Sequence, residues 1–449
     1  MTPDLKGARV AILGSGREGL SAYEYLSARG DTASLAMITE GRSGRSREAD
    51  LESRGLLRVC PFDEVDFSPF DVLVRSPGVS IYRQCLQRAS DAGVSITSPS
   101  SIWFQAHPDA RTVVITGTKG KSTTSALLAH LGRARGFKVQ LAGNIGTPLL
   151  ACDDSGIDWW VIELSSYQIA DLDARPTFGV LLNLTSDHLD WHGSEARYRS
   201  DKLRLAELVG SGGLVANRSD EFLKASLSGR DDIKWFDPEL ADRVLGQAGV
   251  ARMPPSLPGR HNRANLSACL AVLELMDPGA VNSIAGLETF QGLPHRLQSL
   301  GTFDGVEFIN DSISTAPVAT IAALEALQGR PLVLLAGGFE RGIEWSPWAE
   351  AMRAHPPAAL IAMPDNGPKI LQAVQKAGIK PQLGVATAND LQNAVERARS
   401  MAPEGGVVLL SPGAPSFPYF RDFEDRGQQF AEYVSGDAGC ATGEGRKRR

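Results

Sequence analysis

The sequence predicts an α/β protein made of three successive sheet domains, and two observations carry this prediction. Short apolar runs rich in Val, Ile and Leu alternate with segments of helical spacing along most of the chain, a pattern typical of parallel sheets with crossover helices. The length of 449 residues fits about three domains of ~100–200 residues each. We expect a Rossmann-like domain at 1–108, a central domain with a mainly parallel sheet at 109–298 and a second Rossmann-like domain at 299–436, followed by a disordered tail at 437–449.

The composition limits the class of protein. With 43% hydrophobic residues the chain can bury a large core, yet no apolar run approaches the roughly 18 residues that a membrane-spanning helix needs. The N-terminus lacks the charged and then apolar plan of a signal peptide, so we expect a cytoplasmic protein without membrane contact. The formal net charge of -6, with interspersed signs, argues against a nucleic-acid partner. The 5 cysteines are scattered and predict reduced thiols rather than disulfides or a zinc site.

The first predicted strand, residues 8–13, leads through Gly14-Ser15-Gly16 into a helical segment. This order is typical of loops that hold a nucleotide diphosphate on backbone N–H groups at a helix N-terminus. A second predicted strand, 34–39, ends without the acidic residue that grips a ribose in nicotinamide enzymes, because Glu40 comes one place late. We therefore expect nucleotide binding without a nicotinamide site, and an ordinary strand–helix turn is the alternative.

A later predicted strand, 71–75, runs into Ser76-Pro-Gly, at a sheet end of the kind where ligands collect.

The central section opens with a predicted phosphate loop. An apolar strand, 112–116, is followed by Gly117 and Gly120 and then by a helical run. In such a loop the backbone N–H groups hold the phosphates, Lys121 neutralises charge, and the Ser122 hydroxyl faces Mg²⁺. The loop is one residue shorter than the usual Gly-x-x-x-x-Gly-Lys-Ser pattern, and a glycine-rich turn before an ordinary helix is the alternative.

Two further predicted strands of this section end in hard ligands. One ends at Glu163 with hydroxyls behind it, and the other runs from about 180 into His188. In a parallel sheet these ends lie beside the phosphate loop, so Glu163 and His188 are candidates to hold Mg²⁺. The alternatives are that Glu163 caps the following turn and that His188 makes a local hydrogen bond. Lys202 lies on a predicted helix, and its spacing alone indicates a solvated surface lysine.

Asn262 and Asn265 stand three residues apart at the start of another predicted helix, from 266 onward, where they either cap the helix or present an amide to a purine. Arg296 follows a proline turn and suits a phosphate contact. In the last section, predicted strands at 306–310, 331–336 and 406–410 end in polar or glycine residues, where a second substrate is able to dock.

In this order the segments resemble the Mur ligases, over nearly the whole chain. The motifs that carry the resemblance are Thr-Gly-Thr-Lys-Gly-Lys-Ser-Thr from Thr116, Gly-Asn-Ile-Gly from Gly143, Glu-Leu-Ser-Ser-Tyr-Gln from Glu163, Asn-Leu-Thr-Ser-Asp-His from Asn183, Tyr-Arg-Ser-Asp-Lys-Leu from Tyr198, Gly-Arg-His-Asn from Gly259, Leu-Pro-His-Arg from Leu293 and Asn-Asp-Ser from Asn310. Together they are more specific than either glycine loop. The resemblance implies the three-domain architecture of that family, with a central domain of the P-loop ATPase type.

The resemblance also implies an activity, an ATP-dependent amide ligase of peptidoglycan precursor synthesis, and thus a role in cell-wall biogenesis, cell shape and division. ATP phosphorylates the free carboxylate of UDP-N-acetylmuramoyl-L-alanine, the amino group of glutamate attacks the acyl phosphate, and phosphate leaves. Two Mg²⁺ sites are implied, and we expect a monomer.

The family pattern assigns roles to individual residues. Those implied in catalysis are Lys121, Glu163, His188 and Lys202. Those implied to hold metal are Ser122, Glu163, His188 and Lys202, the last as a carbamate. Those implied to bind ATP are Gly117, Thr118, Lys119, Gly120, Lys121, Ser122, Thr123, Asn265, Arg296 and Asp311. Those implied to contact the UDP-linked substrate are Gly14, Ser15, Gly16, Ser76, Asn144 and Ser165.

The chain departs from the family pattern where the amino acid binds. Ligases that add D-glutamate commonly carry a lysine where this chain has Ile313, and a Gly-Gly-Asp-Gly-Lys segment where it has Gly337-Gly-Phe-Glu-Arg341. Because inversion at Cα exchanges the directions of the carboxylate and the side chain, an opposite enantiomer demands a new arrangement of cations. We therefore expect an L-glutamate-adding ligase, in which the candidates for binding glutamate are Thr315, Arg341, Ser416 and Phe423.

Three alternatives remain open at this stage. A ligase that adds D-glutamate would show the same motifs after drift in the glutamate pocket. A nicotinamide-dependent oxidoreductase would explain the Gly14–Gly16 loop but would leave the central phosphate loop without a role. A non-catalytic nucleotide-binding protein would keep that loop without turnover.

Overall fold

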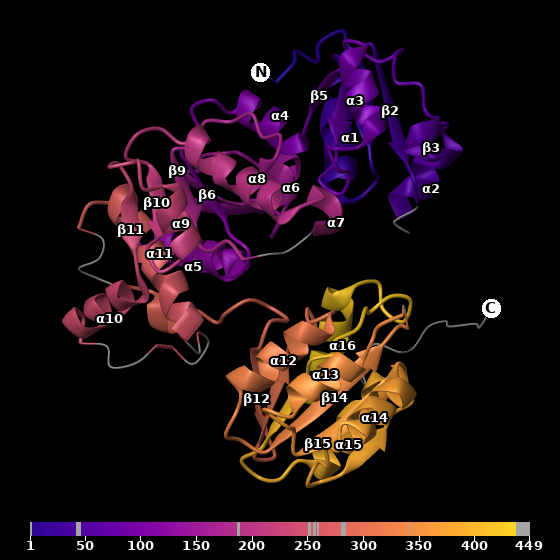
Figure 1. The fold of residues 1–449 in the computed structure, drawn as a ribbon, viewed down its shortest axis with the longest axis vertical. Helices are drawn as coiled ribbons and strands as arrows, with labels where there is room; N and C mark the ends of the chain where they lie inside the picture. The colour runs from indigo at the N-terminus through magenta and orange to yellow at the C-terminus, as the bar shows by residue number, and fades with distance from the viewer. Residues whose placement is uncertain are drawn as a thin grey trace. The chain divides into compact units, whose positions relative to one another are not determined.

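The structure is a computed structural model that describes residues 2–41, 46–185, 189–249, 253–254, 257, 260–279, 284–340 and 342–436. The chain divides into two compact units. The first unit comprises Met1–Met253 with Arg260–Phe290, and the second comprises Pro254–Gly259 with Gln291–Arg449. Within the described residues the first unit contains two sheets and the second contains one, each covered by helices (Figure 1).

The N-terminal sheet has five parallel strands in the order β3-β2-β1-β4-β5. Its apolar, β-branched strands are buried and are joined by crossover helices, as parallel pairing requires. In chain order the elements are β1 (Arg9–Leu13), α1 (Arg17–Arg29), β2 (Ser34–Thr39), α2 (Ser46–Ser53), β3 (Leu57–Val59), η1 (Phe62–Glu64), β4 (Val72–Arg75), α3 (Gln84–Asp91), β5 (Ser95–Thr97) and α4 (Pro99–Ala106).

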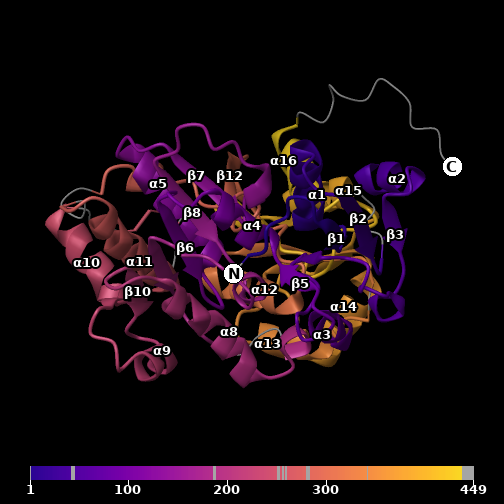
Figure 2. The same cartoon turned by 90° about the horizontal axis from the view of Figure 1, so that it is seen from above.

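The central sheet has six parallel strands in the order β11-β10-β9-β6-β8-β7. Helix α5 contacts β6, β7 and β8 and runs beside them (Figure 2). The elements are β6 (Thr112–Thr116), α5 (Lys121–Ala134), β7 (Val139–Gly143), η2 (Leu149–Ala151), β8 (Trp159–Glu163), α6 (Ser166–Ile169), β9 (Phe178–Leu181), α7 (Leu189–His192), α8 (Glu195–Leu208), β10 (Leu214–Asn217), α9 (Glu221–Ser226), β11 (Lys234–Phe236), α10 (Pro238–Gln247), α11 (Arg260–Met276) and η4 (Leu287–Thr289).

The sheet of the second unit has the order β12-β13-β17-β14-β15-β16, in which β12 is antiparallel to β13 and the other pairs are parallel. The elements are β12 (Gln298–Phe303), β13 (Val306–Asn310), α12 (Pro317–Ala326), β14 (Leu332–Gly338), α13 (Ser346–Met352), β15 (Ala359–Asp365), α14 (Gly367–Lys376), β16 (Val385–Thr387), α15 (Leu391–Met401), β17 (Val407–Leu410) and α16 (Phe423–Ser435).

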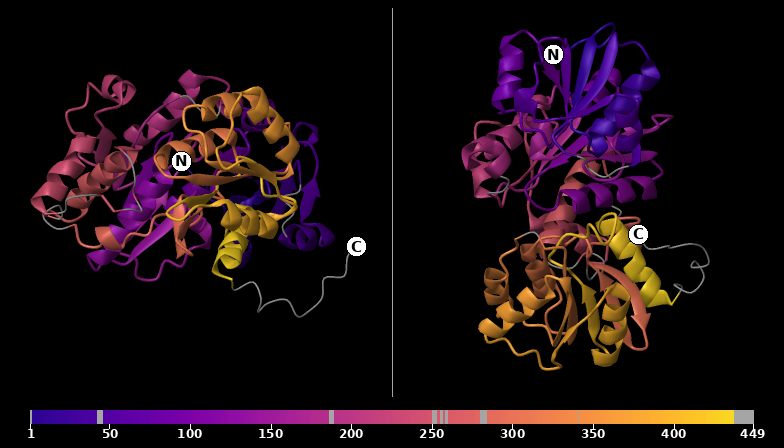
Figure 3. Two further views of the ribbon diagram at one scale, coloured as in Figure 1. Left: turned by 90° about the horizontal axis from the view of Figure 1, so that it is seen from below. Right: turned by 90° about the vertical axis from the view of Figure 1, so that its right-hand side faces the viewer.

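The core of the second unit lies on both faces of its sheet. Alternate strand residues such as Leu334 and Leu409 pack with α12, α13 and α14. Their neighbours, such as Leu335 and Leu410, pack with α15 and α16. Strands buried on both faces explain the unbroken apolar runs in the sequence, and the helix layers lie on either side of the sheet (Figure 3).

The predicted α/β class with mainly parallel sheets is confirmed. The expected domain limits at 108 and 298 stay a prediction. One helix differs from expectation, because α11 starts at Arg260 rather than at 266. Asn262 and Asn265 therefore lie inside the helix and do not cap it, and they satisfy one another through an Asn265 Nδ2 to Asn262 Oδ1 hydrogen bond of 3.0 Å. Among the described residues, no helix is both long and apolar enough to cross a membrane.

A buried arginine joins the two sheets of the first unit. Arg75, at the end of β4, has a fully buried side chain, and its guanidinium binds both carboxylate oxygens of Asp171 at 2.8 and 2.6 Å. It also donates to the carbonyl of Val79 at 2.7 Å and to that of Tyr167 at 2.8 Å. One cation thus holds the turn after β4 and the segment after α6 together.

We expect Arg75→Ala to lower the free energy of unfolding by about 3–5 kcal/mol, because it leaves a carboxylate and several carbonyls without their donor. Urea unfolding followed by tryptophan fluorescence measures the change. Arg9→Ala is the matched control, since Arg9 also binds an aspartate, Asp71, through two hydrogen bonds but at an exposed position. Equal effects of the two substitutions would contradict a special role for the buried pair.

Candidate active site

The phosphate loop predicted from the sequence lies between β6 and α5, with backbone packed closely around it. A Cβ on Gly117 would lie 2.8 Å from Leu182 Cβ, and one on Gly120 would lie 2.5 Å from Asn265 Oδ1. Gly120 has φ +87° and begins α5 without a side-chain cap. The start of α5, with the N–H groups of Ser122 and Thr123, is therefore suited to an anion.

Residues that follow β9 hold this loop in place. Asn183 brackets Lys119, since its Oδ1 accepts from the Lys119 N–H and its Nδ2 donates to the Lys119 carbonyl, both at 2.9 Å. The Thr118 hydroxyl lies 2.7 Å from the Tyr198 hydroxyl and 3.0 Å from the Thr185 carbonyl. The roles of Asn183 and Tyr198 were not predicted, because only the pairing of β6 with β9 brings Asn183 to the loop and only the packing of α8 beside β9 brings Tyr198 there.

Lys202 is not the solvated lysine that its spacing indicates. Its side chain is buried, with 2% exposed, and its Nζ donates to the Gly117 carbonyl at 2.9 Å and to Thr116 Oγ1 at 3.3 Å. Lys121 Nζ donates to the same Gly117 carbonyl at 3.0 Å. Two ammonium groups thus meet on one carbonyl oxygen of the phosphate loop.

Glu163 ends β8, and its pairing with Ile115 places it next to β6. The residue is buried, with 1% exposed. Its Oε1 accepts from Asn144 Nδ2 at 2.7 Å, whereas its buried Oε2 has no hydrogen-bond partner among the described residues. Glu163 does not cap the following turn, because Ser165 and Gln168 form the capping box of α6. A buried carboxylate oxygen without a donor, beside a phosphate loop, fits Mg²⁺.

The described residues contain no group of three or more His, Cys, Asp or Glu side chains able to hold a metal by themselves. Mg²⁺ is commonly held by one or two protein ligands together with water and substrate phosphates. His188, the other predicted metal ligand, lies outside the described residues.

The residues expected to contact the UDP-linked substrate gather between the two sheets of the first unit. Ser76 Oγ donates to the Gly14 carbonyl at 3.1 Å, and Gly16 begins the 13-residue helix α1 without a side-chain cap. Arg17 reaches across to the Asn144 carbonyl at 2.9 Å. The buried Ser15 has its hydroxyl 3.3 Å from Thr39 Oγ1.

Glu18 and Gln168 make a second contact between these sheets. Gln168 Nε2 lies 3.4 Å from Glu18 Oε1 and its own Oε1 accepts from the Ser165 hydroxyl at 2.9 Å. Burial raises the pKa of Glu18 to about 7. Glu40 is engaged elsewhere, because Arg83 binds both of its carboxylate oxygens, so it does not serve a ribose as in nicotinamide enzymes.

The three other residues expected to contact ATP, Asn265, Arg296 and Asp311, fall in different units. Asn265 lies against Gly120 of the phosphate loop in the first unit. Arg296 and Asp311 belong to the second unit. The buried Asp311 accepts from the hydroxyls of Ser314 and Ser411, at 2.5 and 2.8 Å, and burial raises its pKa to about 6.

The candidates for binding glutamate lie at the carboxyl edge of the third sheet. Thr315 and Ser416 follow β13 and β17, which are paired in parallel, and Phe423 begins α16 and accepts from Ser312 Oγ at 2.8 Å. A cavity of about 430 Å³ opens beside them, lined by 417–421 with Asp425 and Gln429. Arg341 lies outside the described residues.

Arg426 was not predicted to be part of this edge. Its guanidinium is buried and donates to the Ser312 hydroxyl and carbonyl and to the Ala414 carbonyl, at 2.7–3.0 Å. Burial lowers its pKa to about 9. An arginine on a helix is normally solvated, so the sequence gives no sign that Arg426 is buried. Only the packing of α16 against the sheet buries it.

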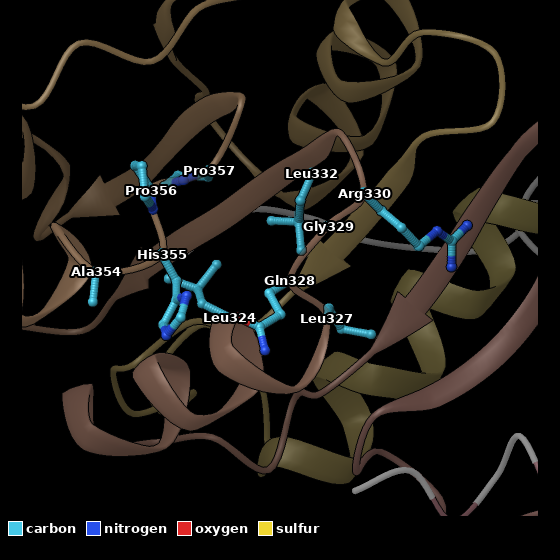
Figure 4. A pocket seen from close by; sticks show the side chains of 10 residues that line it. All are labelled: Leu324, Leu327, Gln328, Gly329, Arg330, Leu332, Ala354, His355, Pro356 and Pro357. Carbon is cyan, nitrogen blue, oxygen red and sulfur yellow. The ribbon is translucent and has the colours of Figure 1, made fainter.

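A second cavity, of about 280 Å³, lies at the other end of this sheet (Figure 4). It is lined by Leu332 at the start of β14 and by the turns 327–330 and 354–357. Ligand-binding groups in parallel sheets collect at the carboxyl ends of the strands, so this cavity does not belong to the site.

Three family models match the chain. They are described as Mur ligase MurD-like N-terminal domain, Mur ligase middle domain, and Mur ligase glutamate ligase domain, and they match residues 8–98, 115–236 and 295–413. A relative from Xanthomonas euvesicatoria is 39% identical over 96% of both chains, and one from Xylella fastidiosa is 40% identical over 95% of both. Both relatives are named UDP-N-acetylmuramoyl-L-alanine–L-glutamate ligase.

The chain belongs to the Mur ligase family.

The resemblance seen in the sequence is thus confirmed. Solved structures show the same fold for this Mur ligase. The UDP-N-acetylmuramate–alanine ligase MurC of Thermotoga maritima superposes with a TM-score of 0.57 at 17% identity, over 96% of this chain and 100% of that one. The MurF ligase of the same organism, solved in complex with ADP, gives 0.56 at 15% identity over 97% of both chains.

We expect Gly120→Ala to abolish detectable binding of an ATP analogue, because the added Cβ meets Asn265 Oδ1 in the phosphate loop. Gly136→Ala is the matched control. Gly136 has nearly the same backbone, φ +90°, but open space around it, so this variant carries the left-handed strain of about 1–2 kcal/mol without the clash. Titration calorimetry with Mg²⁺ and the analogue measures both. Equal loss of binding in the two variants would show that strain rather than the clash matters.

We expect the stability of the protein to rise, relative to Asp311→Asn, as the pH falls from 7.5 to 5. The folded pKa of Asp311, about 6, lies above its usual value of 3.8. Protonation of Asp311 therefore adds to the free energy of unfolding in full below pH ~4, and this stabilisation is lost as the pH rises through the folded pKa. The expected difference is about 1 kcal/mol, read from urea unfolding at both pH values. Asp304→Asn, at an exposed loop position, is the control. A difference that does not vary with pH would contradict the assignment.

Proposed function

We propose that this Mur ligase is an ATP-dependent amide ligase that joins L-glutamate to UDP-N-acetylmuramoyl-L-alanine, in the cytoplasmic synthesis of peptidoglycan precursors. The observation that carries the proposal is the 37–40% identity, over 95% or more of both chains, to relatives named for that reaction. The protein acts as a monomer of three domains, 1–108, 109–298 and 299–436.

The phosphate loop binds ATP. The N–H groups at the start of α5 hold the phosphates, and Lys121 turns from the loop carbonyls toward the γ-phosphate when the nucleotide is bound. Ser122, Glu163 and His188 would hold Mg²⁺, which would supply neutralisation of phosphate charge. Asn265, Arg296 and Asp311 contact the rest of the nucleotide.

The reaction balances without a covalent enzyme intermediate. A carboxylate oxygen of the UDP-linked substrate attacks the γ-phosphorus, and ADP leaves. The amine of glutamate then attacks the acyl carbon, loses a proton, and inorganic phosphate leaves with the electron pair of the C–O bond. Two negatively charged groups must approach each other in the first step, so the task of the chain is to position them and to face them with cations.

Lys202 is carbamylated in the working enzyme. Its ammonium shares the Gly117 carbonyl with that of Lys121 in a buried setting, where two like charges repel strongly. Loss of one proton from the ammonium gives the neutral amine, and addition of CO₂ with loss of a second proton gives a carboxylate-like anion. The carbamate completes a second Mg²⁺ site.

L-Glutamate binds at the carboxyl edge of the third sheet. Thr315, Ser416 and Phe423 lie there in the structure, and Arg341 supplies a guanidinium for a carboxylate, with a forked geometry that a lysine lacks. Ile313, half-buried, occupies the place of a lysine that D-glutamate ligases commonly carry.

The test is a phosphate-release assay with ATP, Mg²⁺, UDP-N-acetylmuramoyl-L-alanine and either enantiomer of glutamate. We expect turnover that requires both acceptors and that favours L-glutamate by at least about 100-fold in kcat/KM, since one lost charged contact costs several kcal/mol. Turnover of D-glutamate alone would overturn the stereochemical assignment.

Glu163→Gln is the loss-of-function control for this assay. It keeps the size of the side chain and an oxygen for Asn144 but loses the charge that binds Mg²⁺, so kcat should fall by about 100-fold or more. Full activity of this variant would remove Glu163 from the site without affecting the choice of enantiomer.

A further inference from the structure

The first unit contains a network of four hydrogen-bonded side chains that the proposed reaction does not use. Asp201 accepts from the Tyr82 hydroxyl on one carboxylate oxygen and meets His192 Nδ1 on the other, both at 2.6 Å. His192 Nε2 in turn lies 2.9 Å from Ser166 Oγ. Three of the four side chains are buried, with 8% of Asp201, 1% of Ser166 and none of His192 exposed.

Two of these four residues, Ser166 and Asp201, lie close in sequence to residues of the candidate site. Ser166 follows Ser165 and lies three residues beyond Glu163, at the start of α6. Asp201 directly precedes Lys202 in α8. Tyr82 ends the segment that begins at Ser76. A single carboxylate therefore connects the substrate segment of the N-terminal sheet with the helix that carries Lys202.

Aromatic and backbone contacts reinforce the same connection. The Trp191 ring stacks on Tyr167 at 4.6 Å and meets the edge of Tyr82 at 5.8 Å. Trp191 Nε1 donates to the Pro77 carbonyl at 3.1 Å, and Ser80 Oγ donates to the Trp191 carbonyl at 2.9 Å. The segment from Ser76 to Tyr82 is thus bound to α7 and α8 along its length.

The Ser166–His192 and His192–Asp201 distances of 2.9 and 2.6 Å fall within the hydrogen-bond range of a hydrolytic Ser–His–Asp triad, but the setting does not suit one. Ser166 Oγ is buried inside the unit, so no carbonyl substrate reaches it. A fully satisfied buried polar network instead holds its members in one arrangement, because any movement leaves a buried polar group without a partner.

We propose that Tyr82 and His192 are positioning residues, which act through Asp201 to keep the segment Ser76–Tyr82 in register with Lys202 and Glu163. This inference rests on the proposed function for the identity of the ligand at Ser76. The position of the segment Ser76–Tyr82, and with it the binding of the UDP-linked substrate, thereby depends on the carboxylate of Asp201.

The test starts with Tyr82→Phe, which removes one hydroxyl at a residue that is 39% exposed and so leaves packing intact. We expect the KM for UDP-N-acetylmuramoyl-L-alanine to rise about 10-fold, as for loss of a hydrogen bond to a charged group, with the KM for ATP changed less than about twofold. Tyr25→Phe, a partly buried phenol in the same sheet domain outside the network of four, is the matched control. An unchanged KM, or equal changes for both substrates, would overturn the proposal.

A double-mutant cycle with His192→Asn tests whether the two residues act through one carboxylate. Asparagine keeps a donor toward Asp201 but loses the link to Ser166. If both act through Asp201, the fold-change in kcat/KM of the double variant is smaller than the product of the single changes. If the fold-change of the double variant instead equals the product of the two single fold-changes, the effects are independent and the proposal is wrong. A drop in melting temperature without a change in KM would contradict it as well.

Binding without turnover separates this proposal from the proposed function. Trp191 packs against the Tyr82 ring, so tryptophan fluorescence titrated with UDP-N-acetylmuramoyl-L-alanine in the absence of ATP gives a Kd. The variant Trp191→Phe identifies the reporting residue. A wild-type protein that binds this ligand but does not turn over glutamate refutes the ligase reaction, while an increased Kd for Tyr82→Phe still supports the network. A wild-type protein that turns over glutamate, with the same Kd in Tyr82→Phe, refutes the network alone.

Discussion

The carbonyl oxygen of Gly117 accepts hydrogen bonds from two lysine ammonium groups, and much of the first unit is arranged around the backbone that makes this possible. The loop turns so tightly that a Cβ at Gly117 or Gly120 would meet its neighbours. The strand order β9-β6-β8 supplies those neighbours, since β9 brings Asn183 to one side of the loop and β8 brings Glu163 to the other. Opposite charges and the N-terminus of a helix thus converge where a triphosphate is proposed to bind.

The cost of burying charge governs the rest of this unit. Arg75 is paired with Asp171, Asp201 is shared by Tyr82 and His192, and Glu163 Oε1 is bound by Asn144. Each of these contacts joins elements that are distant in sequence, because a buried charge has to recruit its partner wherever the fold supplies one. Against this background one carboxylate oxygen of Glu163 differs, because it has no donor among the residues that the structure describes. In the second unit, the buried Arg426 and Asp311 are likewise bound by hydrogen-bond partners, at the edge where glutamate is proposed to bind.

How far the sequence predicted this site depends on whether a residue's role is local. Gly120 and Lys121 were predicted from a strand–loop–helix order that is contiguous in the chain, and Glu163 from its place at a strand end. Lys202 was not, because helical spacing describes which residues share a face and not what covers that face; only the family resemblance drew attention to it. Tyr82, His192 and Arg426 carried no pattern at all, since their partners lie 119, 9 and 114 residues away. The sequence predicted a helix start at 266, after Asn262 and Asn265, but the helix begins six residues earlier, at Arg260. Both asparagines are accommodated inside it, because their amides hydrogen-bond to each other.

By itself the sequence determined the α/β class, the alternation of strands and helices and the phosphate loop, because hydrophobic periodicity and glycine positions act over a few residues. Its ordered motifs also determined the family. Only the tertiary structure decided that Lys202 is buried against Gly117, that Glu163 keeps one oxygen without a donor, and that a shared carboxylate connects Tyr82 with the helix of Lys202. These features depend on which strands are adjacent and which helix covers them, and long-range packing sets that adjacency in ways that no local pattern records.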